Sequence, residues 1–359
     1  MDQKFTNWLV KEYKNGLAPI DYLLIFGTLA AGLFLRSTVW SAPLENAPYQ
    51  NTIVGMKIVT TVFDLLVAVM LGILVHRLTG HKIQAFLAYG IGMVLPVLAA
   101  GSAMWAMGDS VYLFFVLMSL YLLLAGENYF VLSLCFYGMG IFFNLYALFL
   151  LPVYIWCFFI RKGASNSVLG FLAPVAGLIL HLFMDQGAAS SFILFKEEGK
   201  LSAAREEILL SYNFPNLFQV IGKDAYVHEY GQAFRYLVLA AVLLVTVIGI
   251  RLIREMMAKQ IVTAGFLLSM AIPWLLPFMD ERAGLLAAVL SILYGFCNIR
   301  YFYVPIIQVT ITYLAYAAYF RGESFLPMSA IALMQLGLLI FVSFIFVSER
   351  NVLCSNRKN

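Results

Sequence analysis

Charged residues are scarce in this chain. Only 12% of its 359 residues are Asp, Glu, Lys or Arg, whereas 62% are apolar. A soluble domain of this length needs more polar surface, so the composition excludes a soluble protein and favours a membrane protein. The net charge of +4 is small and spread along the chain. This balance argues against nucleic acid as a partner.

Cysteine and metal-ligating clusters are also scarce. The four cysteines lie in or beside apolar runs or in the C-terminal tail, as Cys135, Cys157, Cys297 and Cys354. Small apolar fillers and a free thiol explain them better than a disulfide scaffold does. Outside the run Asp280–Arg282, no His, Asp and Glu cluster has metal-ligand spacing, so we predict no metal and no covalently bound cofactor.

Long apolar runs are abundant, and they predict an all-α protein, a polytopic bundle of transmembrane helices. Lipid is crossed only by helices or closed barrels, and barrel strands alternate apolar with polar residues. Runs of about 20 residues correspond to single spans, so the 32-residue run 129–160 is divided in two. About twelve helices result, at roughly 20–39, 55–75, 84–104, 110–125, 129–143, 146–160, 167–184, 235–253, 261–277, 283–298, 301–319 and 328–347.

The Lys and Arg residues predict the orientation of this bundle. We divide the chain into an interfacial N-terminal segment 1–19, a bundle 20–347 with a long outer loop at about 185–234, and a tail 348–359. Fourteen basic residues then fall on the side of both termini, and five in the long outer loop. Short outer loops and their flanks hold the other four, Arg36, Lys57, Arg282 and Arg321. Basic loops favour the cytoplasm, so we expect an integral plasma-membrane protein with both termini cytoplasmic.

Asp109 is the first candidate for chemistry on the outer face. It lies in WAMGDSVY at 105–112, a short connection between two expected helices. A carboxylate at the rim of a cavity can act as a base or orient a hydroxyl group. The alternative is structural, because Asp109 or Ser110 could cap the following helix.

Three successive charges form the second candidate. The segment LLPFMDERAGLL places Asp280, Glu281 and Arg282 at an outer helix end after Pro277. An arginine in this position can bind a phosphate with two hydrogen bonds. A solvated loop tip is the alternative interpretation.

Other polar residues on the outer side are weaker candidates. Asn144 lies where two spans meet, and a loop amide is the simpler interpretation. Asn213 and Asn216, in SYNFPNLFQVIG, indicate first a turn. Glu45 is the carboxylate of the first outer loop.

Only one acidic residue lies well inside an expected span. Asp64 lies well inside its span and is expected to pair with a neighbouring helix, and His181 lies near an outer end. A transporter would show more such groups at the midplane, broken helices and matching halves, and the sequence shows no internal repeat.

Five blocks occur in an order that resembles the bacterial GT-C membrane glycosyltransferases of the mannosyltransferase type related to GPI mannosyltransferase II. They are GMKIVTTVFDLLVAVMLGILVHRLTG, SAMWAMGDSVY, FNLYALFLLPVY, SYNFPNLFQVIG and LLPFMDERAGLLAAVLSILYGF. The resemblance covers roughly residues 20–320, and each block alone is weak.

The resemblance implies a GT-C-like fold and an inverting transferase of cell-envelope polysaccharide biosynthesis. Such an enzyme moves a mannose-like hexose from a polyprenyl-phosphate carrier to a glycan or glycolipid acceptor on the outer face. Its partners are this donor, this acceptor and the surrounding membrane lipids. Asp109 matches the Asp of a W-G-Q-x-D-S-like turn that begins at Trp105. Arg282 ends a P-x-M-H-E-R-like motif, and Asn213 and Asn216 match an N-x-P-N-like loop.

The chain also departs from this family pattern. Its first outer loop is short and offers Glu45 where relatives carry an Asp often taken as the base. Asp280 replaces a His, Ala283 replaces an aromatic residue, and Asn144 replaces a Lys. These losses of cations leave an altered donor site or a non-catalytic relative as alternatives.

Two further classes are open alternatives. One is a transporter for a lipid-linked saccharide. The other is an outer-face polysaccharide polymerase, a class that relies on several outer arginines, whereas this long loop offers Arg205 and Arg235 among as many acids.

Overall fold

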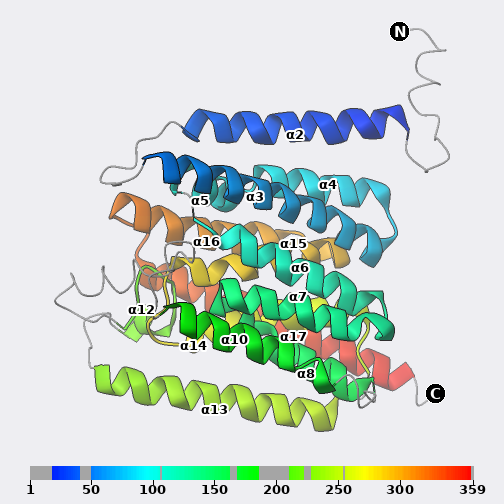
Figure 1. Ribbon diagram of the computed structural model, residues 1–359. Coiled ribbons are helices and arrows are strands. Elements are labelled where there is room, and N and C mark those ends of the chain that lie inside the picture. Colours follow the sequence, from blue (N-terminus) through cyan, green and yellow to red (C-terminus); the bar gives the residue numbers. More distant parts are fainter. Residues whose placement is uncertain are drawn as a thin grey trace. The chain divides into compact units, whose positions relative to one another are not determined.

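The computed structural model describes residues 18–40, 50–105, 107–161, 168–185, 210–221, 228–253 and 255–356, which form helices and no β-strand (Figure 1). Every segment expected to be a helix contains one, which confirms the all-α class. The long helices are α2 (Pro19–Trp40), α3 (Gln50–Thr79), α4 (Lys82–Val94), α5 (Pro96–Trp105), α6 (Asp109–Ala125), α7 (Phe130–Phe143), α8 (Leu151–Ile160), α10 (Leu172–Asp185), α13 (His228–Leu252), α14 (Ala258–Leu275), α15 (Leu285–Cys297), α16 (Tyr303–Arg321) and α17 (Met328–Asn356). Shorter elements are α12 (Leu217–Ile221) and the 3₁₀ helices η1 (Glu127–Tyr129), η2 (Leu145–Leu150), η4 (Glu281–Gly284) and η5 (Ile299–Tyr301).

The chain is a helical membrane protein. In the part of the chain that the structure describes, 6 helices are long and apolar enough to cross a bilayer, or up to 7 if the bent pair α4 and α5 counts as one span. Four further apolar helices have only 10–17 residues, which is shorter than the roughly 20 residues that a span needs. The expected helices are therefore present, but the structure does not support about twelve full-length spans.

The expected single helix 84–104 is broken. α4 ends at Val94, and α5 begins at Pro96 with a bend of 41° between the two helices. Pro96 has no N–H to donate to a carbonyl of the preceding turn, and it disfavours a helical conformation at the residue before it. Leu95 accordingly adopts φ −59° and ψ 112°, outside the helical region.

The chain divides into two compact units, Met1–Ser110 and Val111–Asn359. In the first, α4 packs against α3 and α2, and α5 packs against the same two helices. A Cβ atom on Gly92 would lie 2.8 Å from the Cα of Ala68, so the small residue permits the close approach of α4 to α3. Such small-residue contacts are typical of helices that associate in a membrane.

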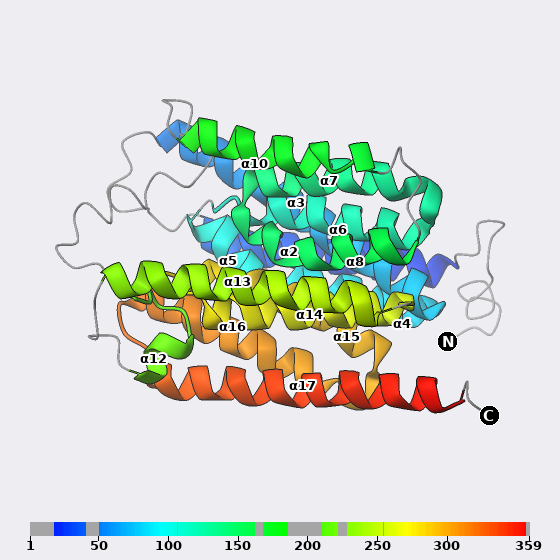
Figure 2. The same ribbon diagram turned by 90° about the horizontal axis from the view of Figure 1, so that it is seen from below.

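The second unit is built around α15. All 13 residues of this helix are buried, and α14 and α16 pack on it, each also in contact with α17. α7 packs closely against α10, where a Cβ on Gly177 would lie 2.1 Å from the carbonyl oxygen of Gly138. α8 packs against α13, and α12 lies beside α17 (Figure 2).

Several helices expose large apolar side chains. α13 has only 17% of its most apolar window buried, and Tyr236, Leu237 and Leu243 are each more than 60% exposed. Apolar surface of this kind is stable in lipid rather than in water. Among the described residues, α13 therefore has the apolar surface expected of a lipid-facing helix of the second unit.

Candidate functional site

Three connections of the second unit, far apart in sequence, meet at one place. They are residues 144–150 after α7, residues 210–221, and residues 276–284 between α14 and α15; we call them the loop cluster. Phe278 N–H donates to the Leu210 carbonyl at 2.8 Å, and Tyr212 N–H donates to the Met279 carbonyl at 3.0 Å. The Tyr146 hydroxyl donates to Oδ1 of Asp280 at 2.7 Å. Three blocks that the sequence singles out are thus joined directly.

Asp280 and Arg282 form an ion pair within the loop cluster. Oδ2 of Asp280 accepts hydrogen bonds from Nε and Nη2 of Arg282 at 3.0 and 2.6 Å. Oδ1 accepts the Arg282 backbone N–H at 3.0 Å, in addition to the Tyr146 hydroxyl. These four hydrogen bonds occupy both oxygens of the Asp280 carboxylate. Its geometry is suited to holding the Arg282 side chain in place.

The run of three charges is not a solvated loop tip. Asp280 is 9% exposed and Glu281 4% exposed, so the alternative interpretation of this segment is wrong. Asp280 caps the 3₁₀ helix η4, whose Gly284 lies against α16 and the 210–221 loop. A Cβ on Gly284 would lie 3.2 Å from Oγ1 of Thr312 and 3.3 Å from the ring of Phe214.

The three asparagines of the loop cluster serve its local structure. Oδ1 of Asn144 accepts the Tyr146 N–H at 2.8 Å and so begins η2. Asn216 is fully buried, and its side chain donates to the Leu276 carbonyl at 3.2 Å. Asn213 adopts φ 51°, the left-handed conformation that asparagine tolerates in turns. The turn and loop contacts expected of these residues are present, and their supporting roles in a site stay predictions.

A second guanidinium lies at this place, from an arginine that the sequence presents only as part of the long outer loop. Arg235, in the first turns of α13, lies with its Cζ 5.0 Å from the centre of the Phe278 ring. Phe278 has φ 62°, which is strained for an aromatic residue and fixes its ring at the turn before Asp280. The signal in the sequence is weak, because Arg235 is a single basic residue at the end of a long polar loop.

The remaining site candidates belong to the first unit or fall outside the described residues. Asp109 is the first residue of α6 and is 7% exposed. The hydroxyl of its neighbour Ser110 donates to the Thr60 carbonyl at 3.1 Å. Trp105 is the last residue of α5. Glu45 lies outside the described residues. Asp109 belongs to the first unit and Arg282 to the second, so their meeting in one cavity stays a prediction.

A charged network is buried in the first unit, beside the break between α4 and α5. Nε and Nη2 of Arg36 donate to Oδ2 of Asp64 at 3.2 and 3.1 Å, which confirms the expected pairing of Asp64 with another helix. Nη1 of Arg36 donates to the Met93 carbonyl at 2.7 Å, and Ser102 Oγ donates to Asp64. Arg36, expected at the flank of a loop, is only 2% exposed because its guanidinium satisfies both the carboxylate and the broken helix.

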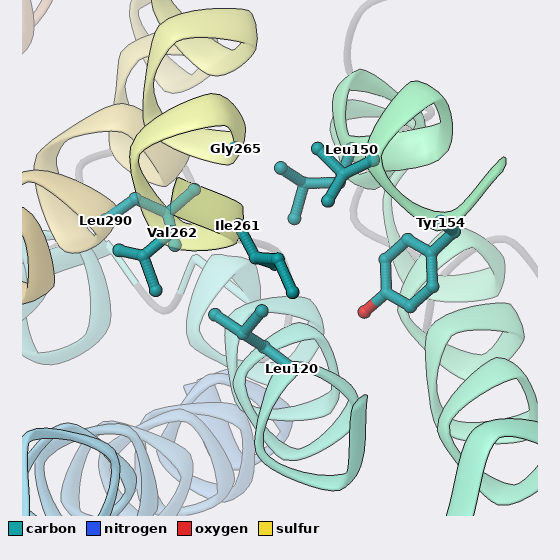
Figure 3. Close-up of a pocket in the computed structure, with 8 residues that line it drawn as sticks. Leu120, Leu150, Tyr154, Ile261, Val262, Gly265 and Leu290 are labelled. Atoms are coloured by element: carbon teal, nitrogen blue, oxygen red, sulfur yellow. The ribbon is translucent and has the colours of Figure 1, made fainter. Parts of the chain in front are cut away.

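His181 lies at a helix contact of the second unit, and one small cavity of this unit is lined by described residues. Nδ1 of His181 lies 2.8 Å from the Phe142 carbonyl oxygen, across the contact of α10 with α7. The cavity has room for about one water molecule and is lined mostly by aliphatic side chains around Tyr154 (Figure 3). It is far too small for a sugar. No group of His, Cys, Asp and Glu that could hold a metal occurs among the described residues.

The architecture defines a class, a helical membrane protein with a polar loop cluster at one end of its second unit. No family model, no curated protein and no solved structure matches the chain.

Proposed function

We propose that the protein is a GT-C type membrane glycosyltransferase that transfers a mannose-like hexose from a polyprenyl-phosphate sugar to a lipid-linked or cell-surface glycan. The observation that carries the proposal is the junction of Tyr146, Asp280 and Arg282, which come from two of the sequence blocks that resemble this family. The backbone pairing of residues 210–212 with 278–279 adds a third block. If these three blocks resembled the family only by chance, there would be no reason to expect contacts between them.

The chemistry needs a base and a cation. A carboxylate removes the proton of the acceptor hydroxyl, and the hydroxyl oxygen attacks the anomeric carbon. The bond from that carbon to the phosphate oxygen breaks. The configuration is inverted, and the lipid phosphate leaves with the bonding electrons. Arg282 stabilises the charge that develops on this phosphate, and no second acid is required. Asp109 and Glu45 are the candidates for the base.

The same proposal assigns the orientation and the location. The chain lies in the plasma membrane with both termini in the cytoplasm, and the loop cluster faces outward, where glycan acceptors are assembled. The proposed bundle is GT-C-like, and its described apolar helices of 10–17 residues can be embedded in the membrane without crossing it fully.

Sugar transfer by the purified protein in liposomes tests the proposal. A panel of polyprenyl-phosphate hexoses is supplied with a glycolipid acceptor, and Asp109→Asn and Glu45→Gln are compared. The variant that removes the base is expected to lose about 10²–10⁴-fold in rate, and the other carboxylate variant much less. Glu323→Gln is the control, because Glu323 is an exposed carboxylate in the connection between α16 and α17. Folded protein that transfers from no donor would contradict the proposal.

A second candidate, transport of a lipid-linked saccharide, is favoured by one observation. The broken helix α4–α5 lies beside the buried Arg36–Asp64 pair, and discontinuous helices with buried charges are typical of transporter sites. A fluorescent lipid-linked saccharide in the same liposomes would then move between leaflets, and Asp64→Asn would slow it at least about tenfold. A wild-type rate equal to that of protein-free liposomes rejects transport.

A further inference from the structure

Arg235 combines an aromatic contact with a charge that no described carboxylate compensates. Its guanidinium lies over the Phe278 ring, and among the residues that the structure describes no carboxylate lies within ion-pair distance of it. The side chain is half-buried at the start of a lipid-facing helix. An arginine whose guanidinium lies over an aromatic ring still has N–H groups that can donate to an oxyanion.

The other cation of the loop cluster is largely neutralised. Asp280 accepts two hydrogen bonds from the Arg282 side chain, so this pair carries no net charge, and Glu281 beside it is a buried carboxylate. A phosphate that approaches Arg282 alone meets no net positive charge. Arg235, which contacts Phe278 two residues before Asp280, supplies the missing charge at the same turn.

The position of Arg235 also indicates where an anion would come from. Its neighbours on α13, Tyr236 and Leu237, are 68% and 62% exposed and therefore face lipid. A phosphate carried on a lipid can reach Arg235 from within the bilayer plane at the level of the headgroups, with its chain lying along α13. A soluble phosphate would lack the apolar contacts that this helix offers.

We propose that Arg235 and Phe278 form a binding site for the phosphate of a polyprenyl-phosphate carrier, at the lipid-facing side of the loop cluster. The choice of carrier rests on the proposed function, and the phosphate chemistry rests on the two side chains. Arg235 binds the phosphate while the sugar remains bonded to it, and Arg282 stabilises the same phosphate as it leaves. Arg235 thus compensates for the two cations that are replaced by Asp280 and Asn144.

Binding of a sugar-free polyprenyl monophosphate tests this site without any catalytic step. The full chain is placed in phosphatidylcholine nanodiscs, and the lipid is titrated for wild type, Arg235→Gln and Arg235→Lys. Loss of a charge-assisted hydrogen-bonded contact is expected to weaken binding roughly ten- to a hundredfold in Arg235→Gln. Arg235→Lys retains the charge but loses the planar guanidinium, so its affinity should lie between those of wild type and Arg235→Gln.

Arg321→Gln is the matched control. The Arg321 guanidinium also lies over a phenylalanine ring, 4.5 Å from the centre of Phe325, but its side chain is exposed at the end of α16. We expect this variant to bind the polyprenyl phosphate as wild type does. Thermal unfolding of each variant in the nanodiscs verifies that the binding change is not caused by loss of the fold.

Two competitors separate the possible sources of the phosphate. Phosphatidylglycerol and inorganic phosphate are each tested for displacement of the bound polyprenyl monophosphate. Weak displacement by both supports the assignment of the site to a polyprenyl-phosphate carrier. Equal competition by either would overturn the assignment to a polyprenyl lipid, and unchanged affinity in Arg235→Gln would overturn the site. If binding depends on Arg235 while no donor supports sugar transfer, the phosphate site stands and the transferase proposal fails.

Discussion

Replacing Arg282 with alanine is expected to lower the rate of sugar transfer by about 10²–10³-fold, the loss typical of removing one group that stabilises a developing anion. The effect should fall on kcat, because the charge on the phosphate develops in the transition state. Steady-state kinetics in liposomes measures the split between kcat and KM. Arg300→Ala is the control, because Arg300 is an exposed arginine that lies 5.8 Å over the ring of Tyr301, outside the loop cluster.

Tyr146 and Asp280 act on this reaction as positioning residues. Tyr146→Phe removes one hydrogen bond to Asp280 and should lower kcat about three- to tenfold without a large change in the unfolding temperature. Asp280→Asn weakens the hold on Arg282 and should lower kcat further. If the two residues act through Arg282, neither substitution should slow Arg282→Ala further. Full additional losses in that background would contradict a positioning role.

The helices could be predicted from the sequence, and the number of full spans could not. Apolar runs determine helices directly, because a backbone in lipid must satisfy its own hydrogen bonds. The length of each helix depends on where the helix begins and ends. Single residues determine these positions, through capping hydrogen bonds and prolines. Asn144 begins η2 with a side-chain hydrogen bond, and Pro96 interrupts a run that hydropathy alone treats as continuous.

The candidate site was predictable in its parts and not in its contacts. The motif blocks identify Asp280, Arg282 and the 210–221 loop, but a motif does not reveal that Asp280 would neutralise Arg282. That pairing depends on η4, which turns the Arg282 side chain back onto the carboxylate. The contact of Arg235 could not be predicted because its partner Phe278 is more than forty residues away in sequence, and only the fold brings them together.

The two buried ion pairs differ in their exposure and in the elements that they connect. Asp280 and Arg282 are near neighbours in sequence at a loop, and their side chains are about a tenth exposed. Arg36 and Asp64 come from different helices and are almost fully buried. The first pair is suited to a site that a ligand reaches, and the second to joining helices.

Substitution of Asp64 with alanine is the second change from which we expect a large effect. Arg36 would remain buried without its carboxylate, and removal of one partner of a buried pair costs about 3–5 kcal/mol. The Met93 and Gly32 carbonyls still accept from Arg36, at 2.7 and 3.1 Å, which places the expected loss toward the lower end. Unfolding of the protein in detergent micelles, followed by increasing denaturant, measures the difference.

A double substitution separates the charge from the packing. The double variant Arg36→Met with Asp64→Leu removes both charges of this pair. It should therefore be less destabilising than Asp64→Ala alone, which leaves the Arg36 charge buried. Ser37→Ala is the control beside it, because the exposed Ser37 hydroxyl donates only within its own helix, to the Phe34 carbonyl at 2.7 Å, and its loss should cost a few tenths of a kcal/mol. If Asp64→Ala unfolds at the same denaturant concentration as wild type, the pair does not hold α2 and α3 together. In that case the Arg36 contact with Met93 at the broken helix would be the one that fixes α2.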